Sequence, residues 1–268
     1  MRPRSPGSTL APGYETIEHL ARSNRLDVYD AWDHTRECRC VVKTLRPDLR
    51  GHKGARAALL REGRLLQRLV HPNIVRGYET LRDPYPMVVM ETLGGETVAH
   101  LIDRRERPLS AIELAFLGLH LSSAIRYLHR EGILHLDLKP SNVIAENGRA
   151  KVIDLSLARR PGRVKAGVGT WCYLAPEQAR PGEVGAPADV WGIGVTLYEA
   201  AAGDTPFGDD SLEYPQLEMR APALARERPR LPRSLTELVD ACLEPAPEQR
   251  PSVAEVASAL AGIAGSRG

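Results

Sequence analysis

Apolar residues occur in short strand-like runs near the start of the chain and at helical spacing further on. The strand-like runs cover residues 14–20, 26–32, 38–45 and 87–90. Leucines on or near one face make residues 54–69 an amphipathic helix pattern. The spacing therefore predicts a β-rich first part that contains one helix.

The remainder of the chain predicts helices. Three segments carry the Ser-x-x-Glu pattern of a capping box, in which two side chains accept hydrogen bonds from free amides at a helix start. They are residues 110–113, 234–237 and 252–255. The first opens a long apolar stretch through Ile125 and Leu128, which leads into a polar loop. These segments predict three helix starts in a mainly helical second part.

The polar loop ends in a predicted β-hairpin. Asn147-Gly148 is the dipeptide of a type I′ turn, in which both central residues need positive φ. Counting outward from this turn brings Asn142 and Asp154 close together at the open end. An amide oxygen beside a carboxylate suits Mg²⁺, which takes few protein ligands and completes its shell with water and phosphate. Asp137 and Lys139, just upstream, can supply an acid-base group and a phosphate-directed cation.

Composition narrows the class of protein. The chain has 268 residues, enough for one large core or two packed lobes, and a net charge of +2, which implies no nucleic-acid partner. Its 4 cysteines lack zinc spacing, and we expect free thiols in a reducing cytosol. We see no apolar run long enough to span a bilayer and no signal peptide, so we expect a cytoplasmic protein without a membrane partner.

The loop carries a family resemblance. His-Leu-Asp-Leu-Lys-Pro-Ser-Asn at 135–142 resembles the catalytic loop of protein kinases, H-x-D-x-K-x-x-N. Lys139, two residues after the aspartate, resembles the serine/threonine branch. Asp154-Leu155-Ser156 stands in the place of Asp-Phe-Gly. The abundance of arginine over lysine suggests a GC-rich genome, and the chain looks like a bacterial, actinobacterial-like member.

Further motifs occur in the family's order from about residue 14 to the end. Val41-Val42-Lys43 resembles Val-Ala-Ile-Lys, and Glu62 stands at the place of the helix glutamate that pairs with that lysine. Ala-Pro-Glu ending at Glu177, Asp189 and Arg250 match later family positions. We expect Glu177 and Arg250 to form a buried ion pair, and Asp189 to anchor the catalytic loop.

The resemblance implies an α+β, two-lobed protein-kinase-like fold. A small antiparallel β-sheet lobe with one helix would precede a larger, mainly α-helical lobe, with ATP in the cleft. The implied organisation is a flexible tail at 1–13 and a kinase domain at 14–268, divided into an N-lobe at 14–90, a hinge at 91–95 and a C-lobe at 96–268.

The resemblance also implies roles for individual residues. Asp137 would accept or orient the substrate hydroxyl, Lys139 would stabilise the γ-phosphoryl group, and Thr170 would bond both of them. Asn142 and Asp154 would hold Mg²⁺. The ATP site would comprise Lys43, Glu62, Leu20, Val28, Val41, Met90, Glu91, Leu93 and Ile144. In it, Lys43 binds the α- and β-phosphates, and the Glu91 carbonyl and the Leu93 amide bond the adenine edge.

The chain departs from the family in its glycine-rich loop. Ala21, Ser23 and Leu26 occupy the three glycine positions, and Ser156 replaces the glycine of Asp-Phe-Gly. Glycine permits close backbone approach and positive φ, which leucine does not adopt easily. We therefore predict a reduced affinity for nucleotide.

A second departure concerns regulation. Leu136 replaces an arginine that binds a phosphorylated activation loop in many kinases. Between Asp154 and Glu177, the hydroxyl side chains are Ser156, Thr170 and Tyr173, all at motif positions. The middle of this segment, which stands in the place of the activation loop, therefore offers no phosphoacceptor. We infer a kinase that activation-loop phosphorylation does not switch.

Three functions fit these patterns. The first is an ATP- and Mg²⁺-dependent serine/threonine protein kinase that acts on Ser/Thr hydroxyls of protein substrates. The second is a pseudokinase that acts as a regulatory binding module, which the missing glycines favour and the full set of charged residues disfavours. The third is a small-molecule kinase, which Thr170 and the Ala-Pro-Glu segment argue against.

Overall fold

The computed structural model describes residues 2–104, 107–208 and 212–265, and the chain divides into two compact units, Met1–Gly94 and Gly95–Gly268. In the described part of the first unit, six strands form one antiparallel sheet in the order β1-β2-β3-β4-β6-β5. The strands are β1 (Thr9–Ala11), β2 (Tyr14–Arg22), β3 (Leu26–Asp33), β4 (Cys38–Leu45), β5 (Gly77–Leu81) and β6 (Met87–Glu91).

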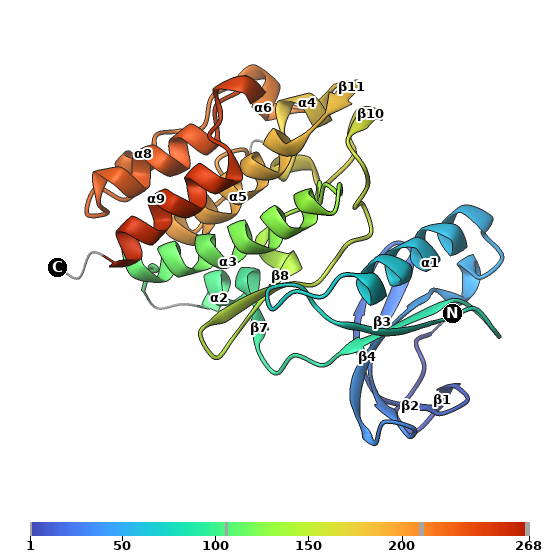
Figure 1. The fold of residues 1–268 in the computed structure, drawn as a ribbon. Helices are drawn as coiled ribbons and strands as arrows, with labels where there is room; N and C mark the ends of the chain where they lie inside the picture. The colour runs from blue at the N-terminus through green and yellow to red at the C-terminus, as the bar shows by residue number, and fades with distance from the viewer. Residues whose placement is uncertain (1, 105–106, 209–211, 266–268) are drawn as a thin grey trace. The chain divides into compact units, whose positions relative to one another are not determined.

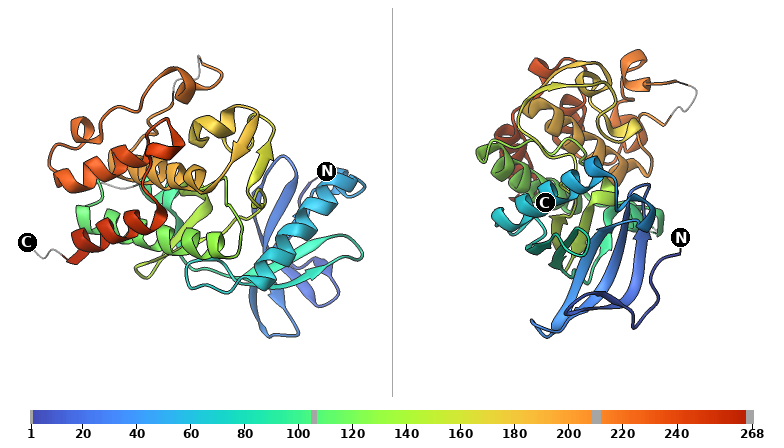
Figure 2. Two further views of the ribbon diagram at one scale, coloured as in Figure 1. Left: turned by 45° about the horizontal axis from the view of Figure 1, so that its top comes forward. Right: turned by 90° about the vertical axis from the view of Figure 1, so that its right-hand side faces the viewer.

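Helix α1 (Lys53–Arg68) lies on one face of this sheet, against β4, β5 and β6 (Figures 1 and 2). Leu59 and Leu66 are 2% and 0% exposed, which is the apolar face that the sequence pattern predicted. Gly63 sits at the closest approach, because a Cβ there would lie 2.3 Å from Thr80 Oγ1. The close packing brings the neighbouring Glu62 into the interior, where it is 1% exposed.

The chain before residue 14 is part of the first unit, so the prediction of a flexible tail at 1–13 is wrong for the residues that the structure describes. Strand β1 pairs with β2, and Leu10 and Ala11 are 2% and 3% exposed in the core. Arg4 donates to the carbonyl of Thr9, and Tyr85 Oη donates to the carbonyl of Leu10. Leu10 supplies the apolar anchor, which the Pro, Gly and Ser content of this segment concealed. Residue 1 lies outside the described residues.

The second unit is mainly helical. Its longer helices are α3 (Ala111–Arg130), α5 (Ala186–Ala202), α8 (Arg233–Cys242) and α9 (Val253–Gly265). Helix α3 packs on α5 and α9, and α8 packs on both α5 and α9 (Figures 1 and 2). Shorter helices are α2 (Val98–Arg104), α4 (Pro176–Ala179), α6 (Pro215–Glu218) and α7 (Leu224–Glu227).

Two small sheets complete the described part of this unit. One contains β7 (Glu96–Thr97), β8 (Val143–Glu146) and β9 (Arg149–Val152), and the other contains β10 (Gly162–Val164) and β11 (Gly182–Val184). Asn147 and Gly148, between β8 and β9, have φ of 49° and 75°. These values are those of the type I′ turn that the dipeptide predicted.

Two of the three predicted capping boxes are present. Ser110 Oγ accepts from the Glu113 amide, and Glu113 accepts from the Ser110 amide. Ser252 and Glu255 form the same reciprocal pair. The third prediction is wrong, because α8 starts at Arg233 after Pro232, which places Ser234 inside the first turn. Glu237 instead accepts from Arg233 Nε at 2.7 Å.

Helix α3 corrects the expectation that no apolar segment is long enough to span a bilayer. Among the described residues, this 20-residue helix is the one whose length and composition would allow it. Half of its apolar window is buried within the unit, where it packs on α5 and α9. A buried core helix has the same length and composition, so the finding is weak evidence for a membrane span.

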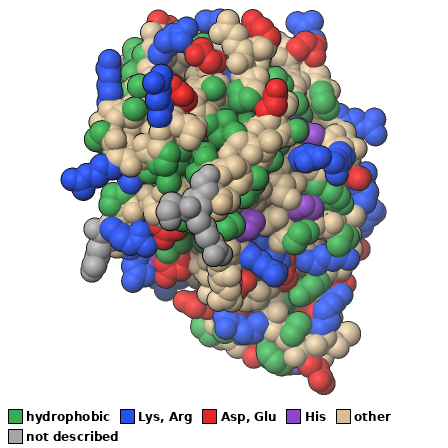
Figure 3. Space-filling model, turned by 60° about the vertical axis from the view of Figure 1, so that its left-hand side comes forward, with side chains coloured by type: hydrophobic (Ala, Val, Ile, Leu, Met, Phe, Trp, Pro, Cys, Tyr) green, Lys and Arg blue, Asp and Glu red, His purple; other side chains and the backbone are tan. Residues whose placement is uncertain are grey.

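Charges of both signs share the face of the molecule that Figure 3 draws. On the face drawn in Figure 3, Lys and Arg side chains are interspersed with Asp and Glu side chains and with apolar ones. This distribution agrees with the net charge of +2. A net charge this small gives little long-range field to steer a strongly charged partner.

The predicted ion pair between Glu177 and Arg250 is formed. Arg250 Nη1 and Nη2 lie 2.7 and 2.8 Å from the two carboxylate oxygens, and the arginine side chain is 0% exposed. The guanidinium also donates to the carbonyls of Glu244, Pro187 and Pro245 and lies 5.0 Å from the Trp191 ring centroid. This bidentate pair joins α4 to the segment that precedes α9.

We expect Glu177→Gln to lower the free energy of unfolding by about 3–5 kcal/mol, because it leaves the buried Arg250 charge without its partner. Glu237→Gln is the matched control, since its partner Arg233 is 89% exposed and such surface pairs contribute little. Denaturant unfolding of both variants measures the difference. Equal stabilities of the two variants would contradict this role for the pair.

Candidate active site

A cluster of three polar side chains lies at the catalytic-loop motif. Thr170 Oγ1 donates to Asp137 Oδ1 at 2.7 Å, and Lys139 Nζ lies 3.2 Å from Asp137 Oδ2. Lys139 Nζ also donates to Thr170 Oγ1. The structure thus brings together the three residues to which the sequence motif assigned catalysis. A carboxylate and an ammonium are held side by side, with one hydroxyl bonded to both.

The backbone of this loop is held by a carboxylate from α5. Asp189, 1% exposed, accepts from the amides of His135 at 2.9 Å and Leu136 at 2.8 Å. His129 Nε2, at the end of α3, lies 2.7 Å from the same carboxylate. Asp189 therefore orients the residues immediately before Asp137, in agreement with its predicted anchoring role.

Leu136 adopts an unusual backbone conformation. Its φ is 65°, in the left-handed region that costs a non-glycine residue of the order of 1–2 kcal/mol. The side chain is only 4% exposed, and the amide is bonded to Asp189. A strained residue persists where its surroundings over-determine it, often next to functional groups. Leu136 precedes Asp137 directly.

The predicted magnesium ligands lie at the base of the β8–β9 hairpin. Val143 pairs with Val152, and the Ile153 amide donates to the Asn142 carbonyl at 3.0 Å, so Asn142 and Asp154 flank the last paired residues. Asn142 Nδ2 donates to the Asp137 carbonyl at 2.9 Å and to its carboxylate at 3.1 Å. These bonds orient the amide and leave its oxygen as the group that suits a cation.

This donor set fits Mg²⁺. Asp154 Oδ1 accepts from the Ser156 amide at 2.7 Å, which orients the carboxylate. Among the described residues, no group of three or more His, Cys, Asp or Glu side chains could hold a metal ion by itself. One amide oxygen and one carboxylate match a cation that is bound through few protein ligands together with substrate phosphates.

The first unit holds the other charged residues of the predicted ATP site. Lys43 on β4 and Glu62 on α1 form an ion pair at 2.6 Å, with side chains 8% and 1% exposed. The pairing agrees with the role that the family motif assigned to these residues. Because α1 approaches the sheet closely at Gly63, the glutamate reaches the lysine inside the unit.

Four apolar residues of the predicted ATP site lie on strands of both units. Leu20 on β2 is 51% exposed, while Val28 and Val41, on β3 and β4, are half-buried. Ile144, also half-buried, lies on β8 of the second unit.

The predicted hinge begins where β6 ends. Met90 is 3% exposed and pairs with Val41. Glu91 ends the strand, with its amide bonded to the Arg76 carbonyl and its carboxylate accepting from the Arg76 amide at 2.8 Å. Leu93 follows outside regular structure and is half-buried.

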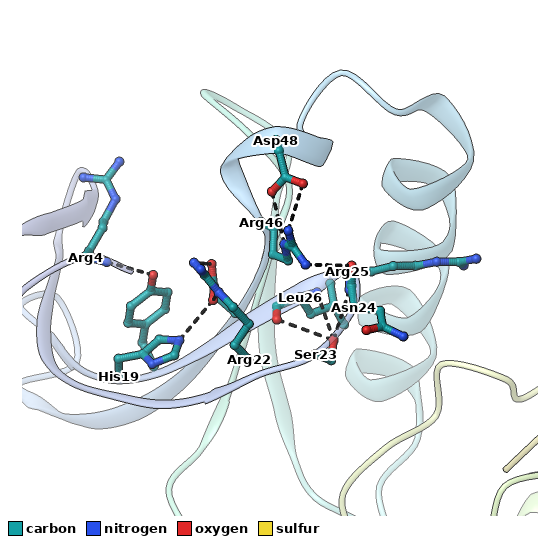
Figure 4. A network of polar contacts seen from close by, with 11 residues as sticks. Arg4, His19, Arg22, Ser23, Asn24, Arg25, Leu26, Arg46 and Asp48 are labelled. Carbon is teal, nitrogen blue, oxygen red and sulfur yellow. Dashed lines mark hydrogen bonds and ion pairs between the residues drawn. The ribbon is translucent and has the colours of Figure 1, made fainter. Parts of the chain in front are cut away.

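The glycine-less loop between β2 and β3 is a closed turn (Figure 4). Ser23 Oγ accepts from the amides of Leu26 at 3.0 Å and Arg25 at 3.3 Å, and the Ser23 amide donates to the Leu26 carbonyl. Arg46, just after β4, donates its backbone amide to the Arg25 carbonyl and its side chain to the Asn24 carbonyl. The amides of Arg25 and Leu26 are thus satisfied within the loop, whereas a glycine loop offers such groups to phosphates.

An ion pair closes the base of this turn. Arg22 donates to both oxygens of Asp27, at 2.7 and 3.0 Å, and His19 Nε2 lies 3.0 Å from the same carboxylate. Asp27 is 0% exposed. Burial alone would raise the pKa of Asp27, but the hydrogen bonds from Arg22 and His19 outweigh it and lower the pKa below its usual range. Sequence reasoning missed this pair, for which the only signal was opposite charges at facing positions of a hairpin.

The sequence matches the protein kinase domain family over residues 14–260. The chain belongs to the protein kinase family. Its structure is similar to the crystal structure of a mutant of the Mycobacterium tuberculosis PknI kinase domain, with a TM-score of 0.78 and 25% identity over 98% of this chain and 100% of that chain. The two-lobed α+β kinase fold expected from the sequence is confirmed.

Three of the relatives are bacterial serine/threonine-protein kinases. A probable serine/threonine-protein kinase of Streptomyces coelicolor is 36% identical over 75% of this chain and 32% of its own length. PkaA of the same organism is 32% identical over 84% of this chain and 43% of its own. PknB of Mycolicibacterium smegmatis is 35% identical over 75% of this chain and 34% of its own. The chain therefore spans less than half the length of these curated relatives.

Proposed function

We propose that this chain is an ATP-dependent serine/threonine protein kinase that transfers the γ-phosphoryl group to Ser/Thr hydroxyls of protein substrates. The observation that carries the proposal is the hydrogen-bonded cluster of Asp137, Lys139 and Thr170. Phosphoryl transfer requires mainly positioning and neutralisation of charge, because the chemistry itself needs little covalent help. The serine/threonine kinases among the relatives support the same reaction and acceptor class.

The roles follow from chemistry at each atom. The acceptor hydroxyl oxygen attacks the γ-phosphorus, its proton passes to the Asp137 carboxylate, and the bond from phosphorus to the ADP oxygen breaks. Lys139 neutralises charge that develops on the transferred group. Thr170 holds Asp137 and Lys139 at their mutual distance, so that both groups are oriented before substrate binds.

Lys43 binds the α- and β-phosphates and is itself oriented by Glu62. Asn142 and Asp154 would hold Mg²⁺, which would offset the negative charge of the phosphates. Asn142 has a second role within the chain, because its amide nitrogen donates to Asp137 and restrains the carboxylate. We propose a cytoplasmic location and protein substrates as the partners.

The activity that we propose does not depend on activation-loop phosphorylation. Leu136 carries no charge for a phosphate group, and the hydroxyl residues between Asp154 and Glu177 stand at motif positions. Thr170 contacts both Asp137 and Lys139 directly through its own hydroxyl group. The closed turn at Ser23 favours weak nucleotide binding, which is also the feature that favours the alternative of a pseudokinase.

The direct test is Mg²⁺-dependent transfer of phosphate from labelled ATP to the protein itself and to a generic basic protein. We expect transfer by the wild-type chain and a loss of at least about a hundredfold in Asp137→Asn, which removes the proton acceptor but keeps the shape. Glu237→Gln, an exposed carboxylate on α8, is the matched control and should keep wild-type activity. Absence of both transfer and ATP binding in the wild type would support the pseudokinase instead.

Restoring the three glycines tests the account of the nucleotide loop. We expect the triple variant Ala21→Gly, Ser23→Gly and Leu26→Gly to lower the KM for ATP several-fold, because removal of the Ser23 hydroxyl frees loop amides for phosphate. Glu37→Gly, in the neighbouring β3–β4 turn where φ is 52°, is the control for added glycine. An unchanged KM for ATP in the triple variant would refute the prediction of reduced nucleotide affinity.

A further inference from the structure

The segment between Asp154 and Glu177 must be held in place for the proposed kinase to act, because it carries Thr170. Arginine at position 136, with a phosphorylated side chain opposite, would supply such a hold, but the chain has leucine there. The structure contains a different set of contacts that can keep this segment in place, and the role that we infer for them rests on the proposed function.

Gln178, on the short helix α4, lies at the centre of this region and is 2% exposed. Its Nε2 donates to the Leu136 carbonyl at 2.9 Å and to the Val168 carbonyl at 2.7 Å. Its Oε1 accepts from the Ala175 amide at 3.1 Å. One side chain therefore joins the catalytic loop to two points of the segment that carries Thr170.

The backbone of Gln178 adds to this connection. Its carbonyl accepts from the Gly167 amide at 2.9 Å, and its amide donates to the Ala175 carbonyl at 2.8 Å. Residues 167 and 168 are thus bonded to Gln178 through backbone and side chain. Thr170 follows two residues later.

Leu136 is restrained on both sides by this arrangement. Its amide donates to Asp189 and its carbonyl accepts from Gln178. With φ at 65°, its peptide groups need such partners to stay in the left-handed region. Since Asp137 is the next residue, the position of the carboxylate depends on both bonds.

Gly169 allows the chain to approach this closely. Its φ is 140°, and a Cβ there would lie 2.4 Å from Leu174 Cδ2, 3.1 Å from the Leu136 carbonyl oxygen and 3.3 Å from Gln178 Nε2. A larger residue would push the segment away from the catalytic loop. The close contact is therefore a requirement of the local sequence Gly169-Thr170.

Backbone pairing also anchors the earlier part of the segment. Leu134 and Arg159 exchange two hydrogen bonds, at 2.7 and 3.0 Å. Strand β10 then pairs antiparallel with β11, with Arg163 opposite Glu183. Residues 159 and 162–164 of the segment, which precede the contacts of Gln178, are thus bonded to the rest of the unit through the backbone.

We propose that Gln178 is a positioning residue that holds the Thr170 segment against the catalytic loop, in the place of a phosphate–arginine contact. A neutral amide suits this task, because two buried carbonyls need donors and a carboxylate would face them unfavourably. The hold is permanent, whereas a phosphate can be added and removed. The proposed kinase is therefore assembled as soon as it folds.

The test compares Gln178→Met and Gln178→Glu with the wild type. Methionine keeps the length and loses all three side-chain bonds, while glutamate keeps the shape and the acceptor for Ala175 but loses the two donations. We expect kcat for a protein substrate to fall at least about tenfold in both variants, while the KM for ATP changes less than about twofold. Thr196→Val, which removes a buried bond to the Gly192 carbonyl within α5, is the control and should keep kcat.

Amide hydrogen exchange supplies a readout that needs no phosphoryl transfer. We expect faster exchange over residues 167–175 in Gln178→Met than in Thr196→Val, with protection of α3 and α5 unchanged. Wild-type kcat, or unchanged exchange over 167–175, in folded Gln178→Met would overturn the positioning role. An inactive wild-type chain whose exchange still responds to Gln178→Met would refute the proposed function and leave the positioning role standing.

Discussion

The geometry of the proposed catalytic cluster depends on the hydrogen bonds to the peptide groups on either side of Leu136. Asp189 from α5 holds the amide, and Gln178 from α4 holds the carbonyl. Both side chains are buried, so water does not compete for these bonds. Asp137 is the next residue, so the position of Leu136 sets the position of Asp137. Thr170 and Asn142 each donate a hydrogen bond to a different oxygen of the Asp137 carboxylate.

The turn between β2 and β3, which we propose as the nucleotide loop, also has its amides bonded by its own side chains. Ser23 supplies the acceptor for loop amides, and the buried pair of Arg22 and Asp27 joins the two strands below the turn. A glycine-rich loop gains its function from freedom of the backbone, whereas this loop is fixed by side chains. In both regions, side-chain hydrogen bonds fix the backbone before any ligand binds. Such fixed regions are what we expect of the proposed kinase, which phosphorylation between Asp154 and Glu177 does not switch.

Much of this arrangement could be predicted from the sequence, because each motif specifies how its residues are placed relative to one another. The ion pairs of Lys43 with Glu62 and of Glu177 with Arg250, and the I′ turn at Asn147, were all expected and are present. The burial of Leu10 and the role of Gln178 were not foreseen, because a single leucine in a Pro-rich segment and a glutamine after a motif carry no periodic signal. The start of α8 at Arg233 was missed because Pro232 takes the position before the helix, which the serine pattern had suggested for Ser234.

The central claim is that the catalytic cluster is complete without phosphate on the segment between Asp154 and Glu177. The most direct measurement is transfer activity of the chain produced together with a phosphatase and shown by intact mass to carry no phosphate. Measured at the first turnovers, before self-phosphorylation accumulates, the initial rate should equal that of protein produced without the phosphatase. A phosphate-free chain that is inactive at first and gains activity as it takes up phosphate on this segment would contradict the account.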